Sequence, residues 1–173
     1  MKMFRKIVLT TFVLSFFFVE AQKVPEQNKE VFPVEALNQS IKNQEGKDVT
    51  IQSILDQYKG NVVVLDIWAT WCKDCLIGFP ALEELQAKNP DVKFVYFSLD
   101  KNQDAWKKGI EKYQLVGDHY WFDQGWKNDF NNQIDLNWIP RYLVLDKEGK
   151  IAKYYAVKAD DPAVQETLDL LKK

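Results

Sequence analysis

The two cysteines of the chain, Cys72 and Cys75, are the residues whose type and spacing most directly suggest chemistry. Only two residues separate them, and an apolar run precedes them. A disulfide between them would add only about 2 kcal/mol of stability by chain entropy, so a purely structural bond explains the spacing poorly. A redox pair explains it better, because one thiol can attack a disulfide while its neighbour completes the exchange.

A metal site is the second explanation for two close thiols. A closed zinc site needs about four nitrogen or sulfur ligands, and beyond its two cysteines the chain has a single histidine, His119, which we place in a surface loop. Two thiolates do suit Cu(I), so a Cu(I)-binding metallochaperone of the same fold is the alternative function. The redox interpretation requires no bound cofactor.

The segments around the pair predict a strand followed directly by a helix. Residues 61–68 are β-branched and nearly all apolar, which is typical of a strand buried on both faces. From residue 72 to about residue 88 apolar side chains recur at helical spacing. Cys72 therefore starts a helix, where free N–H groups and the helix dipole lower a thiol pKa. Cys75 lies one turn inside and is more sheltered.

The rest of the chain predicts an α/β fold. We expect a central mixed sheet with helices on both faces, an extra N-terminal β-hairpin and an insert after the second core strand. The expected elements are strands 34–37 and 49–51 around the turn 43–46, helix 51–58, strand 92–99, helix 105–113, strands 142–145 and 151–157 as a hairpin, and helix 162–171.

The N-terminus has the pattern of an export signal. Residues 1–6 are basic, residues 7–19 are largely apolar, and Ala21 fits a cleavage site. The apolar run is short compared with the roughly 20 residues of a membrane helix, so we favour cleavage over an uncleaved anchor. We therefore expect a signal peptide at 1–21, a flexible lead-in at 22–33 and one domain at 34–173. Export makes a working disulfide possible, because exported thiols are not kept reduced by default.

The charge pattern argues against a nucleic-acid partner. The formal net charge is −2, and the sequence has no basic stripe that could neutralise phosphates. We expect a monomer whose partners are other proteins.

The stretch Asp-Ile-Trp-Ala-Thr-Trp-Cys-Lys-Asp-Cys at 66–75 resembles the thioredoxin superfamily, most closely the exported TlpA/ResA-like thiol–disulfide oxidoreductases. Pro80 and the pair Ile139-Pro140 match the same pattern, and the likeness covers about residues 34–173. The resemblance implies that Cys72 is the nucleophile and Cys75 the resolving thiol. It also implies that Pro140 is cis and that the backbone of Ile139 pairs with bound substrate.

Asp66 is a carboxylate inside a predicted buried strand. Burial without a partner raises a carboxyl pKa, which suits a base that works near neutral pH, and we favour this role over that of a satisfied structural aspartate. The resemblance implies that Asp66 deprotonates Cys75. Many ResA-like proteins carry a glutamate three residues after the second cysteine, whereas this chain has Gly78 there. Its acid–base arrangement therefore looks closer to that of thioredoxin.

Aromatic residues surround the pair in the sequence. We expect Trp71 to form a partly exposed lid beside Cys72 and Trp138 to line the rim of the site, both as substrate-binding residues. Trp68 and Trp106 are expected in the core. The aromatic residues of 120–126 lie among glycines and aspartates, which predicts a loop that either packs the insert or contacts partner chains.

The function that we expect is disulfide exchange with client proteins outside the cytoplasm, in the periplasm or cell envelope. The resemblance implies a reductant, in cytochrome c maturation or general periplasmic reduction. A reductant in an oxidising compartment requires an electron donor, which we expect to be membrane-bound. A protein whose pair stays permanently oxidised is a third possibility.

Overall fold

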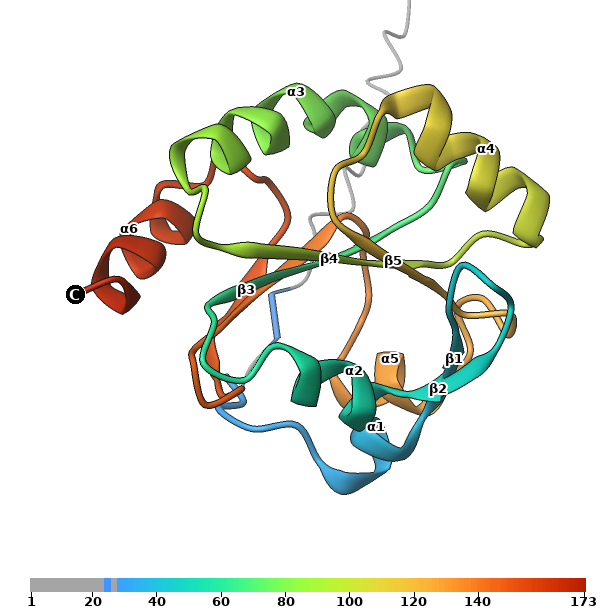
Figure 1. Cartoon of the computed structure of the whole chain (residues 1–173), viewed down its shortest axis with the longest axis horizontal. Coiled ribbons are helices and arrows are strands. Elements are labelled where there is room, and N and C mark those ends of the chain that lie inside the picture. Colours follow the sequence, from blue (N-terminus) through green and yellow to red (C-terminus); the bar gives the residue numbers. More distant parts are fainter. Residues whose placement is uncertain (1–23, 26–27) are drawn as a thin grey trace, which may run out of the picture.

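The structure is a computed structural model, and it describes residues 24–25 and 28–173. The expected signal peptide at 1–21 and part of the expected lead-in lie outside the described residues. The strands form one seven-stranded sheet in the order β2-β1-β5-β4-β3-β6-β7 (Figure 1). Within the described ranges, no helix combines the length and the apolar character needed to cross a membrane.

The elements follow one another in an alternating order. They are α1 (Val34–Asn38), β1 (Ser40–Lys42), β2 (Asp48–Thr50), α2 (Ile51–Gln57), β3 (Val63–Trp68), α3 (Lys73–Lys88), β4 (Lys93–Ser98), α4 (Gln103–Tyr113), β5 (Asp118–Trp121), α5 (Asp129–Gln133), β6 (Arg141–Leu145), β7 (Ile151–Ala156) and α6 (Pro162–Leu171).

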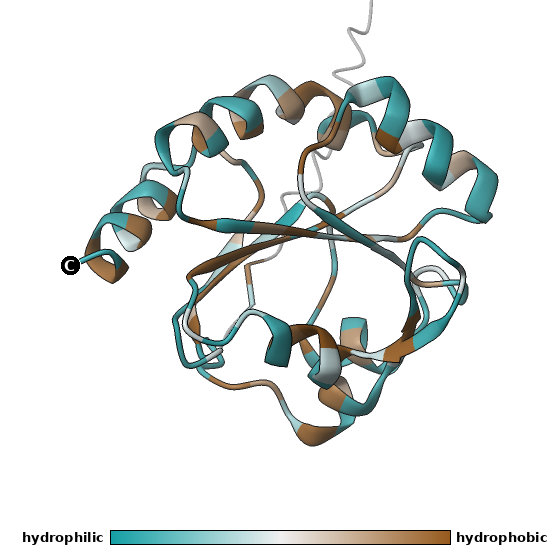
Figure 2. Ribbon diagram, in the orientation of Figure 1, coloured by the Kyte–Doolittle hydropathy of each residue, from teal (hydrophilic) through white to brown (hydrophobic). Residues whose placement is uncertain are grey.

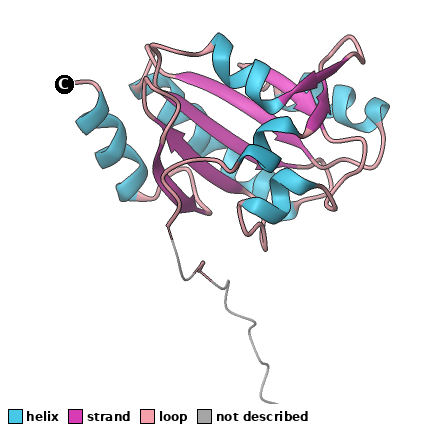
Figure 3. Ribbon diagram, turned by 90° about the horizontal axis from the view of Figure 1, so that it is seen from below, coloured by secondary structure: helices cyan, strands magenta, loops and turns pink. Residues whose placement is uncertain are grey.

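The sheet is mixed and is covered on both faces, as the sequence predicts. Strand β4 runs parallel to β3 and β5, whereas β6 pairs antiparallel with β3 and β7. Helices α3 and α4 lie on one face, and α1, α2 and α5 lie on the other (Figures 1 and 3). The predicted helices and strands from residue 51 onward are confirmed, with ends that differ by one or two residues.

The central strands are apolar because both of their faces are covered. Every residue of β3 is buried, and the hydrophobic colours of Figure 2 concentrate along the central strands. Toward α3, the ring of Trp68 meets Phe79 edge-on at 5.6 Å between centroids. Toward α5, Phe97 of β4 contacts Phe130 at 5.4 Å. Burial of such rings makes β3 and β4 a rigid platform for the residues that follow them.

The N-terminal hairpin exists, but its first strand is not where we expected it. The prediction of a strand at 34–37 is wrong, since these residues belong to helix α1 and the hairpin consists of β1 and β2. Pro33 precedes the first turn, and its carbonyl accepts a bond from the Leu37 amide at 3.2 Å. A short apolar run is compatible with a strand and with a helix, and here the residues form a helix that buries Ala36.

The insert after β4 contains two elements that the sequence analysis missed, β5 and α5. The prediction of a loop is wrong for 120–122, because Tyr120 and Trp121 lie in β5 and both are buried, as is Phe122. His119 is also not in a surface loop. It is buried in β5 and stacks on Tyr96 at 4.6 Å between ring centroids. The neighbouring glycine and aspartates gave this segment the composition of a loop, although Asp118–Trp121 form a four-residue strand.

Part of the segment expected to be a lead-in packs on the domain. Lys29 forms an ion pair with Asp135 at 3.0 Å, and the Glu30 carbonyl accepts a bond from the Ile151 amide at 2.7 Å. Phe32 is buried in the core. The packed unit therefore begins a few residues before 34.

Helix α4 approaches the end of β3 closely at Gly109. A Cβ atom there would lie 2.3 Å from Cγ2 of Thr70 and 3.3 Å from Cη2 of Trp68. We predict that Gly109→Ala lowers the free energy of unfolding by about 1–3 kcal/mol, because overpacking outweighs the better helix propensity of alanine. Denaturant unfolding of the oxidised protein measures this. Lys108→Ala, an exposed change in the same helix, is the control, and equal stability of the two variants would contradict the prediction.

Candidate active site

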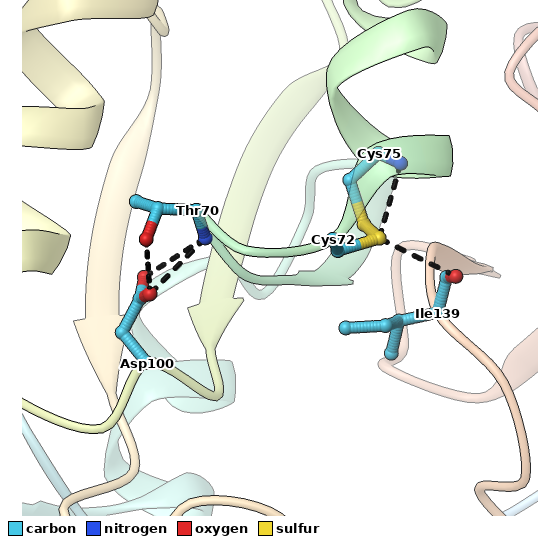
Figure 4. The surroundings of a disulfide bond; sticks show 5 residues. All are labelled: Thr70, Cys72, Cys75, Asp100 and Ile139. Carbon is cyan, nitrogen blue, oxygen red and sulfur yellow. Dashed lines mark hydrogen bonds between the residues drawn. A yellow bond between two sulfur atoms is a disulfide. The ribbon is translucent and has the colours of Figure 1, made fainter.

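Cys72 lies where the loop after β3 enters helix α3. Its amide donates to the carbonyl of Ala69 at 3.1 Å, and its own carbonyl accepts from the Leu76 amide at 3.1 Å. Cys72 is the N-cap residue, and its Sγ atom accepts a hydrogen bond from the Cys75 amide at 3.1 Å (Figure 4). The first sulfur of the pair therefore sits at the positive end of the helix dipole.

The two cysteines form a disulfide, with 5.3 Å between their Cα atoms. Cys75 is fully buried, whereas Cys72 retains an exposed fraction of 6%. The Sγ atom of Cys72 lies 3.5 Å from the carbonyl oxygen of Ile139, and the Ile139–Pro140 peptide bond is cis. Cys72 is thus the more exposed of the two cysteines, and the Ile139 loop lies directly beside its sulfur.

An open groove of about 390 Å³ lies beside the disulfide. Three indole side chains on it are partly exposed: Trp71 by 52%, Trp126 by 38% and Trp138 by 36%. The structure thus brings Trp71, Trp138 and Ile139 together at Cys72, and it adds Trp126 from the loop after β5. The groove is lined by Trp71, Cys72, Lys73, Asp74, Trp126, Asn137, Trp138 and Ile139.

Asp66 lies in β3 on the sheet face that α3 covers. Its side chain is buried, and neither carboxyl oxygen has a hydrogen-bond partner among the described residues. Desolvation raises the pKa of Asp66 well above its ordinary value. Burial without a partner therefore disfavours the ionised form of this carboxyl group.

Asp100, a residue that the sequence analysis missed, fixes the loop that leads to Cys72. Its carboxylate accepts from the Thr70 amide at 3.1 Å and from the Thr70 hydroxyl (Figure 4). It also accepts from the Ser98 hydroxyl at 2.9 Å. The Asp100 carbonyl also accepts from Nε1 of Trp121 at 2.8 Å. The sequence did carry a signal for this role: Ser98 and Asp100 are polar residues at the end of a buried parallel strand, the edge where α/β sheets place functional residues.

Arg141 is the second residue that the sequence analysis missed. It directly follows Pro140, is fully buried, and lies over the ring of Tyr155 at 4.2 Å. Its guanidinium donates to Oδ1 of Asn137 at 2.8 Å and to the Ile134 carbonyl at 3.3 Å. Arg141 therefore holds the segment that carries Trp138 against β6.

No observation favours the copper alternative. Among the described residues, no three or more histidine, cysteine, aspartate or glutamate side chains lie close enough together to hold a metal ion. Nε2 of His119 is engaged with the Leu115 carbonyl at 3.1 Å, and burial lowers the pKa of this histidine.

Comparison with known proteins agrees with this geometry. A family model described as thioredoxin-like matches residues 60–151, more than half of the chain. The chain belongs to the thioredoxin-like family. The expected superfamily and fold are thereby confirmed, and the matched residues include the cysteine pair.

Three similar proteins show how far the likeness extends. The thioredoxin-like protein YneN of Bacillus subtilis is 28% identical over 123 residues, 69% of this chain and 70% of its own. The thiol-disulfide oxidoreductase ResA of Bacillus cereus is 28% identical over 121 residues, 69% of this chain and 66% of its own. A solution structure from Bacteroides vulgatus, described as a candidate thiol-disulfide oxidoreductase, is 35% identical. It covers 77% of this chain and 85% of its own, with a TM-score of 0.64. This thioredoxin-like protein is an enzyme of that class.

The contacts of Asp100 give a testable prediction. Asp100→Asn keeps the shape but replaces one acceptor oxygen with an N–H donor that faces other donors. We expect the free energy of unfolding of the oxidised protein to fall by about 1–3 kcal/mol, with faster hydrogen exchange at the Thr70 amide. Asp104→Asn, an exposed change in the first turn of α4, is the control. Equal stability and equal Thr70 exchange in both variants would show that Asp100 does not hold the loop.

Proposed function

We propose that this protein is exported and reduces disulfides in client proteins by thiol–disulfide exchange at Cys72 and Cys75. One observation carries the proposal: Sγ of Cys72 lies at the N-terminus of α3 beside an open groove, in a disulfide with the fully buried Cys75. This arrangement gives the two sulfurs different roles, with one accessible to a client and the other accessible only to its neighbour.

The first step uses the helix N-terminus. In the reduced protein the Cys75 amide and the dipole of α3 stabilise the Cys72 thiolate and lower its pKa. This thiolate attacks a client disulfide, a new S–S bond forms to Cys72, and the other client sulfur leaves as a thiolate. The client segment lies in the groove between Trp71 and Trp138, with the backbone of Ile139 beside it. Pro140 has no amide N–H that would need a partner there.

The second step uses the buried pair of Asp66 and Cys75. The Asp66 carboxylate takes the proton of the Cys75 thiol, and the pKa of Asp66, which burial raises, makes it a stronger base than an exposed aspartate. The Cys75 thiolate then attacks Sγ of Cys72, the disulfide described above forms, and the second client sulfur leaves as a thiolate. Two electrons have passed from the enzyme to the client.

The direction of electron flow and the compartment belong to the proposal as well. Residues 1–21 would direct export to the periplasm or cell envelope, where disulfides persist. A reductant there needs a renewed supply of electrons, for which we propose a membrane-bound donor. Clients in cytochrome c maturation or general periplasmic reduction fit the resemblance to TlpA/ResA-like proteins. A single copy suffices, because one chain carries the pair and the groove.

Cysteine variants test the two roles. We predict that Cys72→Ser reduces turnover of an oxidised client such as insulin to the uncatalysed background, since no accessible nucleophile remains. Cys75→Ser should accumulate mixed disulfides with the client, because the resolving thiol is absent. Non-reducing gels and intact-mass measurements detect these adducts. Trapping by Cys72→Ser in place of Cys75→Ser would reverse the assignment, and full turnover by both variants would refute the function.

A further inference from the structure

Four buried side chains with ionisable groups form one row across the sheet. Strand pairing places His119 of β5 beside Tyr96 of β4, Tyr96 beside Asp66 of β3, and Asp66 beside Tyr142 of β6. Side chains at paired positions of neighbouring strands point to the same face. All four are buried.

The face that carries this row is the one that α3 covers. Side chains two positions apart in a strand share a face, and Trp68, two residues after Asp66, contacts Phe79 of α3. The row therefore lies directly beneath the helix that carries the cysteine pair.

The hydroxyl of Tyr142 lies under the beginning of α3. A Cβ atom at Gly78 would lie 3.8 Å from this hydroxyl. Gly78 follows Cys75 by three residues, so the two positions lie on the same side of the helix. The Tyr142 hydroxyl thus lies between the sheet and α3, on the side of the helix that carries Cys75, and Asp66 is its neighbour in the sheet.

The two tyrosines beside Asp66 differ in how their hydroxyls are bonded. The Tyr96 hydroxyl accepts a hydrogen bond from Nε2 of Gln86 at 3.2 Å. The Tyr142 hydroxyl has no partner among the described residues, and the same is true of both Asp66 oxygens. Burial of a hydroxyl or a carboxyl without a hydrogen-bond partner costs free energy. Once Asp66 is ionised its oxygens need a donor, and the Tyr142 hydroxyl is a donor that needs an acceptor.

We propose that Tyr142 is a positioning residue for the acid–base step: in the reduced enzyme its hydroxyl donates a hydrogen bond to the Asp66 carboxylate. The inference rests on the proposed function and deepens it. Tyr142 keeps its own proton throughout. The Cys75 S–H bond breaks, an Asp66 O–H bond forms, and the new Cys72–Cys75 bond displaces the client thiolate.

The sign of the effect follows from which form of Asp66 the hydrogen bond favours. A bond to the carboxylate lowers the pKa of Asp66 from the high value that burial alone would give. Without it, Asp66 is ionised only at higher pH, and the release step needs a higher pH. The other ionisable groups near this pair are Tyr96 from β4, His119 behind it, Cys75 from α3 and Asp160, whose charge acts on Tyr142.

The test compares Tyr142→Phe with Tyr96→Phe, which removes the other hydroxyl beside Asp66. Stopped-flow measurements of client release by the reduced protein across a pH series give the midpoint of the release step. Tyr142→Phe should raise this midpoint by about 0.4–1 pH unit, the shift that one hydrogen bond supports. Tyr96→Phe should leave it at the wild-type value. Equal midpoints in Tyr142→Phe and wild type would overturn the proposal.

A second comparison, in the Asp66→Asn background, tests whether Tyr142→Phe acts through the hydrogen bond to Asp66 or through a general change in the protein. There, adding Tyr142→Phe should cause no further shift, because the group that receives the hydrogen bond is absent. A shift of the same size in that background would overturn the proposal. Tyr142→Met removes the hydroxyl with another shape and serves in place of Tyr142→Phe if the latter does not fold.

A failure of the proposed function is distinguishable from a failure of this inference. If the wild-type protein has no turnover, ¹³C NMR of the Asp66 carboxyl in the reduced protein still tests the contact. A higher carboxyl pKa in Tyr142→Phe than in wild type supports the hydrogen bond, and equal values contradict it.

Discussion

The hydrogen bond from the Cys75 amide to the Cys72 sulfur is the interaction on which the rest of the site depends. It exists because Cys72 is the N-cap of α3, with extended backbone just before the helix. At that position a sulfur anion meets unsatisfied N–H groups and the positive end of the helix dipole. The same geometry leaves Cys75 about one helical turn further into α3, where it is fully buried and bonded to Cys72.

Two loops must be held for this contact to be useful, and each is held by a buried charged side chain. Asp100 fixes Thr70 on the helix side of the groove, and Arg141 fixes Asn137 on the opposite side. Both residues are attached to central strands of the sheet: Asp100 comes just after β4, and Arg141 is the first residue of β6. The rigid strands thus set the distance between Cys72 and the Ile139 carbonyl.

The sequence was most informative where one local pattern dominated. The apolar run at 61–68 and the helical spacing after Cys72 predicted β3, α3 and the place of the pair, because burial on both faces and amphipathicity leave clear periods. The segment at 34–37 was wrongly predicted as a strand, since four residues do not define a period. His119 and its neighbours were wrongly placed in a loop, because their burial comes from pairing with β4.

Roles that depend on contacts distant in sequence were the least predictable. Asp100 meets Thr70 across thirty positions of the chain, and Arg141 meets the ring of Tyr155. The place of Asp100 at the end of a buried strand was the one signal in the sequence, and for Arg141 local composition does not separate a buried charge from a solvated one. The row that joins Asp66 to Tyr142 likewise depends on strand register, which only the assembled sheet defines.

The pH dependence of Cys72 alkylation tests the central claim most directly. Reduced protein is treated with iodoacetamide across a pH series, and peptide mass spectrometry assigns the modified cysteine. A sulfur held as an anion at the N-terminus of α3 should titrate below about 7.5, well under the value of about 8.5 for free cysteine. A Cys72 pKa near that of free cysteine, or alkylation of Cys75 before Cys72, would contradict the account.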